Sequence, residues 1–440
     1  KEPPQTEARS ITIPEKKGPA PIIGLVFRGV PQEHDDALPL EMLMTIVGGG
    51  ESSRLYKDLV KEKQIAQVAV AGAFGLEDDG IAGAGAVIMP WGNKQKVMDS
   101  LHEHIEKVRT EPVTQRELDK VKNQLLSQEV MNALTVENKA QLLGQYEVLQ
   151  GGADKANQRL AKIRAVTTED LLRVARIYLV RERETAATVQ PELGGVLKSL
   201  FGGKGSEGDE GAEPVPPPTD NRVAKRGGAR TDMKRPEGFP KEPPSATLLA
   251  AVPKFPTEEF LLPNGLRVVV VPNHEIPYVT ATLGILSGAW TEQKPGTAYL
   301  ASQMVTKGSA KHSAAELAEE LEFNAISLSG GASIDVASVF AQSVTEKFDI
   351  ALNLMAEVVR TSTFPEKELE ILRQQELLGL MIQAKTPEYA ADRELRKRVF
   401  GSHPYARTAI GAPANVQALQ VDDLKAWWNT FVRPDMAVLY

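Results

Sequence analysis

The sequence predicts an α+β fold of two homologous domains, each a mostly antiparallel sheet with helices packed on one face. Strand patterns such as "AQVAVAGAF" and "LRVVVVP" stand beside long helical patterns such as "NKQKVMDSLHEHIEKVR" and "KFDIALNLMAEVVR". Strands and helices do not alternate strictly, as they would in a parallel sheet, so an antiparallel sheet covered on one side is the better prediction. The same order of elements also occurs twice, which indicates two domains of one kind.

Each copy of the repeat opens with a strand and a helix. In the first copy the strand pattern "IIGLVFRG" at 22–29 precedes an apolar helix, "DALPLEMLMTIVG", and the glycine-rich turn "GGGESS". In the second copy "YVTATLGILSG" at 278–288 precedes the helix "GTAYLASQMV" and the loop "KGSAKHS". The order of strand, helix and small-residue turn is therefore shared.

Two segments further along the chain strengthen the correspondence. "VRTEPVTQRELDKVKNQL" from Val108 aligns without a gap on "VRTSTFPEKELEILRQQE" from Val359. Pro112 and Pro365 each follow the first long helix of a copy, where proline ends one helix and can open the next. Each copy should therefore contain two long helices in succession.

The stretch between the two copies has a different composition. Residues 193–250 are dense in Gly, Pro and charge and poor in aliphatic side chains. Such a segment cannot bury enough apolar surface to offset the entropy cost of ordering it. We therefore predict a partly disordered linker at 193–250, between domains at 1–192 and 251–440.

The overall composition excludes several classes of function. The 440 residues are 42% hydrophobic and 25% charged, with a formal net charge of -7. Nucleic-acid binding depends on clustered Lys and Arg that neutralise phosphates, so we expect no nucleic-acid partner. No apolar run approaches the roughly 18 residues that a membrane span needs, so we expect no membrane-spanning segment. The absence of cysteine excludes disulfides, thiolate metal sites and a cysteine nucleophile.

Three motifs occur in an order typical of one peptidase family. They are Gly-Gly-Gly-x-Ser-Ser-Arg-Leu at 48–55, His-Pro-Tyr followed by Ile-Gly at 403–411, and Arg-Pro-Asp-x-Ala-Val-Leu at 433–439. With the segment "GTAYLASQMVTKGS", they make the chain outside the linker resemble peptidase family M16. This family of inverted-motif zinc peptidases includes pitrilysin, insulinase and mitochondrial processing peptidase. The resemblance implies the insulinase/LuxS-like metallohydrolase fold.

The zinc motif of that family is altered in this chain. Active members carry His-x-x-Glu-His on a helix, where the histidines bind zinc from one face and the glutamate acts as base for the metal-bound water. Here Tyr299 and Gln303 replace the histidines, and Ser302 replaces the glutamate. The third ligand, a glutamate about eighty residues further on, falls on Gly379. We therefore predict no catalytic residue and no metal ligand in this chain, and expect zinc in the parent enzyme outside it.

The histidines of the chain have simpler interpretations. His102 and His104 lie two residues apart on a helical pattern, so they point to different faces, and we interpret them as part of a solvated surface. His274 fits a polar turn, and His312 fits a capping loop in which the following serine starts a helix. His403 belongs to the His-Pro-Tyr motif, for which we expect an architectural role.

The segment "GGGESSRL" resembles a phosphate-binding loop only superficially, because it lacks the Gly-Lys-Ser/Thr ending of a P-loop. We interpret it as a tight glycine turn in which Ser52 or Ser53 caps the helix "RLYKDLVKEK". The resemblance implies that this turn faces the interior chamber of the peptidase. Its candidate contacts with a peptide substrate are Gly48, Gly49, Gly50, Ser52, Ser53 and Arg54.

The resemblance also suggests which domains of the enzyme are present. In the family, four homologous domains form two halves that close around an unfolded peptide, and the zinc helix lies in the first domain. Residues 1–192 resemble the C-terminal domain of the first half, and 251–440 resemble a degenerate N-terminal domain of the second half, truncated at its C-terminal end. We expect a fragment that spans the second and third domains of a longer protein.

Two functions follow from the resemblance. The chain is expected to be the non-catalytic middle portion of an M16-type zinc metalloendopeptidase, forming chamber wall and hinge around peptide substrates. The zinc-bearing domain would then be supplied in cis or by a separate active subunit. Alternatively, the chain belongs to a catalytically inactive scaffold or to a partner subunit of a heteromeric peptidase. A periplasmic or exported location is favoured over a cytoplasmic one, because bacterial relatives are often exported.

Limited proteolysis tests the predicted division of the chain. A protease of broad specificity should cut first between Gly194 and Pro244 and leave two resistant pieces, because cleavage concentrates in exposed segments without a packed core. Mass spectrometry of the earliest products identifies the cut. Early cleavage inside 93–129 would contradict the division into two copies.

Overall fold

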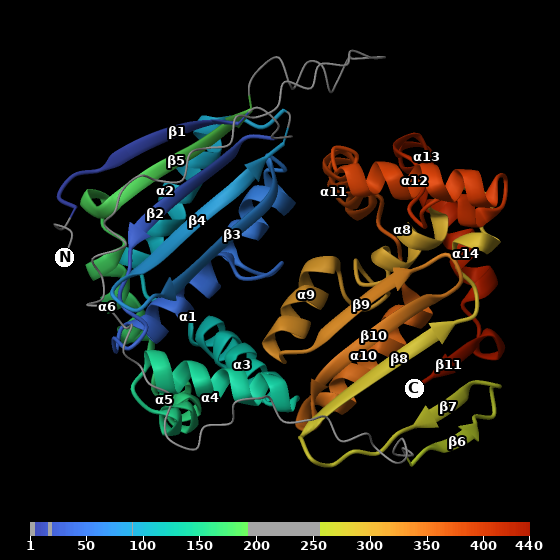
Figure 1. Ribbon diagram of the computed structural model, residues 1–440, viewed down its shortest axis with the longest axis horizontal. Helices are drawn as coiled ribbons and strands as arrows, with labels where there is room; N and C mark the ends of the chain where they lie inside the picture. Colours follow the sequence, from blue (N-terminus) through green and yellow to red (C-terminus); the bar gives the residue numbers. More distant parts are fainter. Residues whose placement is uncertain (1–4, 16–19, 90, 192–255) are drawn as a thin grey trace, which may run out of the picture. The chain divides into compact units, whose positions relative to one another are not determined.

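The computed structural model describes residues 5–15, 20–89, 91–191 and 256–440. We call residues 5–191 the first copy and 256–440 the second copy. Each copy contains one sheet and one hydrophobic core (Figure 1), which confirms the predicted α+β class. The predicted linker at 193–250 lies outside the described residues.

The first copy is built from five strands and a series of helices. The strands are β1 (Arg9–Glu15), β2 (Ile22–Arg28), β3 (Ala66–Gly75), β4 (Gly80–Ile88) and β5 (Glu184–Pro191). The helices are α1 (Ala37–Gly48), the π-helix η1 (Tyr56–Glu62), α2 (Lys94–Thr110), α3 (Gln115–Asn132), α4 (Val136–Leu149), α5 (Arg159–Ala165) and α6 (Thr168–Tyr178). Two short 3-10 helices are η2 (Ala153–Gln158) and η3 (Arg181–Arg183).

The second copy is built in the same manner. The strands are β6 (Glu258–Leu261), β7 (Arg267–Val270), β8 (Tyr278–Ile285), β9 (Ser327–Ala332), β10 (Ala337–Val344) and β11 (Ala437–Leu439). The helices are α8 (Thr297–Met304), α9 (Ala314–Phe323), α10 (Phe348–Thr361), α11 (Glu366–Gln383), α12 (Pro387–Phe400), α13 (Pro413–Ala418) and α14 (Val421–Phe431). Short 3-10 helices are η6 (Ala289–Thr291), η7 (Thr345–Lys347), η8 (Pro404–Ala406) and η9 (Pro434–Met436).

The two sheets share one topology. The first sheet has the strand order β1-β5-β2-β4-β3, and the second has β6-β7-β11-β8-β10-β9. Apart from the additional edge strand β6, the orders correspond strand by strand. In each sheet one pair near an edge is parallel, β1 with β5 or β7 with β11, and the pairs that follow are antiparallel. The repeated topology agrees with the internal duplication inferred from the sequence.

The two long helices of each copy also correspond. The first of them ends at Thr110 in one copy and at Thr361 in the other, as the gap-free alignment requires. In the helices that follow, the aligned residues Leu118 and Leu369 are each 1% exposed, so both face the core of their own copy. The sequence alignment therefore matches positions with the same structural role.

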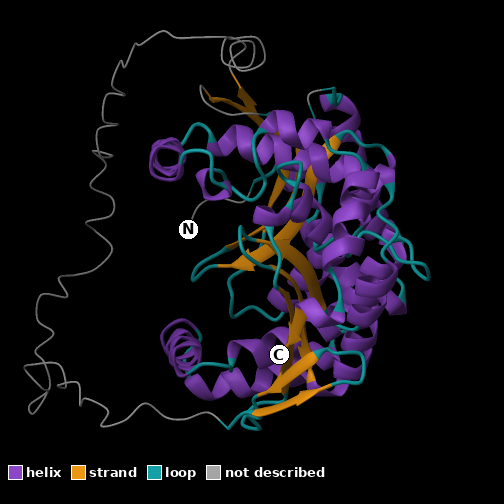
Figure 2. Ribbon diagram, turned by 90° about the vertical axis from the view of Figure 1, so that its right-hand side faces the viewer, coloured by secondary structure: helices purple, strands orange, loops and turns teal. Residues whose placement is uncertain are grey.

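Helices cover one face of each sheet, as Figure 2 shows with most helices on one side of the strands. Along β2, the side chains of Ile23, Leu25 and Phe27 are buried, whereas Ile22 on the opposite face is exposed. Alternation of this kind is expected when only one face of a sheet packs against helices. Each fully buried side chain of this size stabilises the fold by about 1.5–3 kcal/mol. The other face of each sheet remains open to a ligand or to solvent.

The described residues of the two copies belong to one compact unit, and side-chain contacts join them. The side-chain amide of Asn123 in α3 donates to the carbonyl of Phe323 in α9 at 2.8 Å, and the Arg116 guanidinium lies 4.3 Å from the Phe323 ring centroid. Gln67 in β3 and Gln375 in α11 each donate a side-chain hydrogen bond to the other's backbone carbonyl. In the described ranges, no helix combines the length and apolar character needed to cross a bilayer.

A buried arginine fixes the loop around α13. The guanidinium of Arg373 in α11 donates to the carbonyls of three residues, Val416, Gln417 and Leu419. We expect Arg373→Met to lower the free energy of unfolding by about 2–4 kcal/mol, because three carbonyls lose a charged donor. Urea denaturation followed by circular dichroism measures this change.

Arg396 provides a matched control for the Arg373 substitution. It pairs only along the exposed face of α12, where its Nε lies 2.7 Å from Asp392. Arg396→Met should change the free energy of unfolding by no more than about 0.5 kcal/mol. Equal losses in the two variants would show that the carbonyl contacts of Arg373 add no stability.

Candidate functional site

The altered zinc motif lies on α8, a helix whose first turn is held by a buried carboxylate. Glu292, with a fully buried side chain, accepts hydrogen bonds from the backbone N–H groups of Gly296 at 2.9 Å and Ala298 at 2.8 Å. These are donors that the helix itself leaves unpaired, and a negative charge at the N-terminus also suits the helix dipole. Burial raises the pKa of Glu292, but Arg407 lies against it as a counter-charge.

The His-Pro-Tyr motif supplies that arginine. Arg407 follows the motif, pairs with Glu292 and donates to the carbonyl of Ala289 at 2.8 Å. Gly296 precedes the helix with φ of +93°, and a Cβ there would lie 2.5 Å from the carbonyl oxygen of Ile410. The backbone of this motif therefore approaches the start of α8 so closely that only glycine fits.

The side chains at the three altered positions of the zinc motif form hydrogen bonds within the protein. Ser302, which is 0% exposed, donates its hydroxyl to the carbonyl of Ala298 at 2.8 Å, one turn earlier in the same helix. The Tyr299 hydroxyl donates to Oε1 of Glu376 at 3.3 Å, and Gln303 hydrogen bonds to the same tyrosine. Burial, together with the nearby Glu376, raises the pKa of Tyr299, so its hydroxyl stays protonated at neutral pH.

A carboxylate of α11, that of Glu376, contacts the altered motif on α8, whereas the third-ligand position was predicted to fall on Gly379 of the same helix. Gly379 lies about one turn further along α11, and a Cβ added to it would meet no atom within 4 Å. Glu376 is partly buried against Tyr299, and burial raises the pKa of its carboxyl group.

These side chains do not fit a zinc ion. Zinc in proteins is held by imidazole, thiolate and carboxylate groups, usually three or four of them. Here a protonated phenol, a primary amide and a single carboxylate converge. Among the described residues there is no group of three or more His, Cys, Asp or Glu side chains arranged to hold a metal ion. The zinc implied by the resemblance therefore has no matching donor set on α8.

The interpretation of His102 and His104 as a solvated surface is wrong. Nε2 of His102 lies 2.9 Å from Glu184, and Nε2 of His104 lies 3.2 Å from Asp58. The His104 side chain is only 12% exposed, and burial lowers its pKa. Each histidine pairs with a carboxylate of another element, Glu184 of β5 for His102 and Asp58 of η1 for His104. Since they pair with different carboxylates, they do not form one ligand pair.

The other histidine interpretations agree with the structure. His312 contacts Glu357 through Nδ1 at 2.8 Å, and the serine after it caps α9, which confirms the predicted capping loop. Nδ1 of His403 accepts from the backbone N–H of Tyr405 at 3.2 Å, and the two rings pack edge to face. His274 lies exposed in the loop after β7.

The glycine-rich turn is more enclosed than the sequence indicated. Ser52 and Ser53 are buried, and neither caps the helix that follows: Ser53 donates to the carbonyl of Gly50 at 2.7 Å, and Ser52 contacts Glu322 of the second copy. The capping prediction is therefore wrong, because both hydroxyls have other partners. Gly49 begins this turn by donating its N–H to the carbonyl of Thr45 at 2.7 Å.

Gly48 and Arg54 at the two ends of the turn have structural contacts. Gly48 ends α1 where that helix crosses β3, and a Cβ there would lie 2.1 Å from the backbone nitrogen of Ala71. Arg54 forms a bidentate ion pair with Glu117, in which Nε donates to Oε1 at 2.7 Å and Nη2 donates to Oε2 at 2.9 Å. Burial alone would raise the pKa of Glu117, but the hydrogen bonds from Arg54 and Thr114 outweigh it and hold that pKa at about 2.

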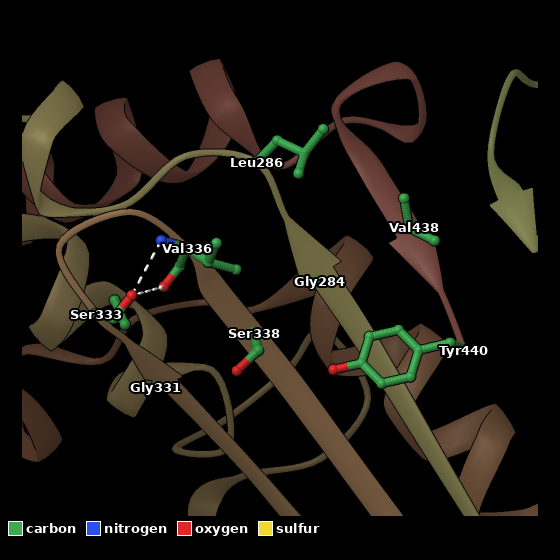
Figure 3. Close-up of a pocket in the computed structure, with 9 residues that line it drawn as sticks. Gly284, Leu286, Gly331, Ser333, Val336, Ser338, Val438 and Tyr440 are labelled. Atoms are coloured by element: carbon green, nitrogen blue, oxygen red, sulfur yellow. Dashed lines mark hydrogen bonds between the residues drawn. The ribbon is translucent and has the colours of Figure 1, made fainter. Parts of the chain in front are cut away.

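The open face of the second sheet carries a groove that the sequence did not reveal (Figure 3). Gly331, Ser338, Gly284 and Val438 pair across four neighbouring strands, so three of the four floor positions have little or no side chain. Leu286 is 58% exposed and Tyr440 is 60% exposed at the sides of this groove, which has a volume of about 520 Å³. The strand β9 beside it is an edge strand.

A second hollow adjoins the first. Leu286 and Val336 line both hollows. The second one has a volume of about 490 Å³ and is also lined by Trp290, Asp335, His403, Pro404 and Tyr405. The combined surface exposes aromatic and aliphatic side chains around a small-residue floor. The signal in the sequence was the small residues within the strands themselves, Gly284 in β8, Gly331 in β9 and Ser338 in β10, and such residues are also common in tight turns.

Comparison with protein families gives two matches along the chain. Residues 1–125 match the model described as peptidase M16 inactive domain, and residues 267–412 match the model for insulinase, peptidase family M16. Together the two matches cover more than half of the 440 residues. They confirm the resemblance inferred from the motifs.

Several curated proteins are similar to part of the chain. "Non-peptidase homolog YmxG" of Helicobacter pylori is 28% identical over 166 residues, which is 37% of this chain and 38% of that protein. The probable mitochondrial-processing peptidase subunit beta of Arabidopsis thaliana is 28% identical, covering 38% of this chain and 32% of that protein. Cytochrome b-c1 complex subunit 1 of Caenorhabditis elegans is 26% identical, and the match covers 44% of this chain and 41% of that protein. The match thus spans about two fifths or less of these relatives.

Several solved structures are also similar to the chain. A peptidase M16 inactive domain from Pseudomonas fluorescens is 28% identical, with a TM-score of 0.40, and the match covers 42% of this chain and 45% of that one. The ferredoxin protease FusC, solved in complex with Arabidopsis ferredoxin, is 16% identical with a TM-score of 0.47, covering 99% of this chain and 49% of that one. On the evidence of the two family models, the chain belongs to peptidase family M16.

Proposed function

We propose that this chain is a non-catalytic part of an M16-type zinc metalloendopeptidase, in which it forms chamber wall and hinge around peptide substrates. The zinc-bearing domain is then supplied elsewhere, in cis or by a separate active subunit. The observation that carries the proposal is the state of α8, where Tyr299, Ser302 and Gln303 occupy the motif positions and are hydrogen-bonded to protein groups.

The chemistry of peptide hydrolysis explains why α8 is unsuited to catalysis. A zinc peptidase needs an open metal position that activates water and a nearby base that accepts the water's proton. Ser302 at the base position is fully buried and donates to the carbonyl of Ala298, so it neither reaches a substrate nor accepts a proton at neutral pH. The helix is therefore a structural element of the degenerate domain.

The groove on the second sheet supports a role in peptide binding. Extended peptides bind sheets through backbone hydrogen bonds at an edge strand, with pockets that receive alternate side chains. The edge strand β9 and the small floor residues Gly331 and Gly284 leave backbone accessible, and Leu286 and Tyr440 offer apolar contact. A wall of this kind also helps to keep bulk water away from a reacting centre.

The purified chain provides the direct test of the proposal. Elemental analysis should find no stoichiometric zinc, and the chain should not cleave a quenched fluorogenic peptide, because α8 offers neither ligands nor a base. Zinc that a chelator removes together with peptidase activity would overturn the proposal.

Binding of a fluorescent unfolded peptide tests the groove. The substitution Gly284→Trp fills the groove floor and should weaken peptide binding, whereas Arg396→Met, on an exposed helix face, should leave peptide binding unchanged.

Restoring the motif tests whether α8 is a degenerate zinc helix. The variant Tyr299→His with Gln303→His places two imidazoles one turn apart on α8, opposite the carboxylate of Glu376. It should bind about one zinc ion per chain, and the same variant carrying Glu376→Gln should lose most of that binding. A folded double variant that takes up no zinc would show that α8 and α11 are not arranged as a former metal site.

A second function is favoured by particular relatives. One similar protein is named a non-peptidase homolog, and another is a subunit of the cytochrome b-c1 complex. By analogy the whole protein would be a catalytically inactive scaffold or a partner subunit of a heteromeric peptidase. Reading the gene upstream of the codon for Lys1 separates the two: an intact His-x-x-Glu-His supports the peptidase, and a further altered helix supports the scaffold.

A further inference from the structure

The glycine-rich turn holds a carboxylate from the other copy. The backbone N–H of Ser52 donates to Oε1 of Glu322 at 3.1 Å, and the Ser52 hydroxyl donates to Oε2 of the same carboxylate. Gly50 has φ of +106°, and a Cβ there would lie 2.5 Å from Oε1 of Glu322. Glycine at this position thus permits both the left-handed backbone and the close approach of the carboxylate.

A buried ammonium group completes the surroundings of that carboxylate. Nζ of Lys120 donates to the Ser52 hydroxyl at 2.6 Å and lies 3.9 Å from Oε2 of Glu322. The Lys120 side chain is only 6% exposed, and Ser52 is also more than nine-tenths buried. A buried ammonium is costly unless a negative charge compensates it, and the two carboxylates that contact Lys120, Glu319 and Glu322, both come from α9 of the second copy.

Further ion pairs between the two copies lie near the Glu322 carboxylate. Glu319 lies 3.3 Å from Lys57 and 3.4 Å from Arg116, both of the first copy. Burial alone would raise the pKa of Glu319, but Lys120 and Lys57 outweigh it and lower that pKa. A basic surface on the first copy therefore meets an acidic face of α9, and the buried pair of Lys120 and Glu322 lies within this contact.

We propose that residues 49–53 together with Lys120 form a carboxylate-binding site, whose resident ligand is the side chain of Glu322, and that this contact joins the two copies. The N–H and the hydroxyl of Ser52 each donate to one oxygen of the carboxylate, and hydrogen bonds to a charged acceptor are the stronger ones. The Lys120 ammonium lies 3.9 Å from the carboxylate as its counter-charge. The site accepts a small carboxylate in solution when Glu322 is absent. The inference does not depend on the proposed function.

Hydrogen exchange of the full chain tests this site. In Glu322→Ala, peptides that cover residues 50–57 should exchange about tenfold faster than in the unaltered chain, because the Ser52 N–H loses its acceptor. Propionate at about 100 mM should restore at least half of the protection, whereas propionamide at the same concentration should not, because only the carboxylate gives Ser52 a charged acceptor and attracts the Lys120 ammonium beside it. Adding Lys120→Met to the variant should abolish the rescue.

Glu320 provides the matched control on the same helix. Its carboxylate accepts from the side chain of Asn324 within the second copy at 2.9 Å, so Glu320→Ala should leave exchange of residues 50–57 unchanged. If Glu322→Ala does not fold, Glu322→Gln takes its place and should speed exchange more than Glu320→Gln does. Equal exchange in the Glu322 and Glu320 variants, or rescue by propionamide as well as propionate, would overturn the proposal.

Discussion

The carboxylate of Glu292 at the start of α8 is the interaction on which the site depends. A buried helix must find acceptors for its first N–H groups, and Glu292 accepts from Gly296 and Ala298 while Arg407 neutralises its charge. Arg407, which follows His-Pro-Tyr, also donates to the carbonyl of Ala289 in η6. Glu292 therefore connects the start of α8 with the segment that follows the His-Pro-Tyr motif.

Much of the architecture follows from sequence patterns because the patterns express burial. The gap-free alignment placed Leu118 and Leu369 at matching core positions, and the strands at 22–29 and 278–288 are observed as β2 and β8. Alternation and helical spacing are local properties that a single sequence contains. The family resemblance added the order of the domains along the chain, which local patterns do not specify.

The errors concern contacts between residues far apart in the sequence. Ser52 looked like a helix cap because its partner, Glu322, is 270 residues away. His104 looked solvated because nothing in its own helix reveals that Asp58 lies beside it. Glu376 was not singled out because nothing within α11 reveals that Tyr299 of α8 lies beside it. In each case the deciding partner comes from another element, and only the tertiary fold brings it close.

The small residues across the second sheet have a consequence for recognition. A floor made of Gly331, Ser338 and Gly284 offers almost no side-chain chemistry, so under the proposed function it would contribute little to distinguishing one peptide sequence from another. Selection among peptide sequences would depend on Leu286 and Tyr440 at the sides of the groove. Substitution of either exposed side chain leaves the sheet itself intact. The selectivity of such a surface can therefore diverge between relatives without any cost to the stability of the fold.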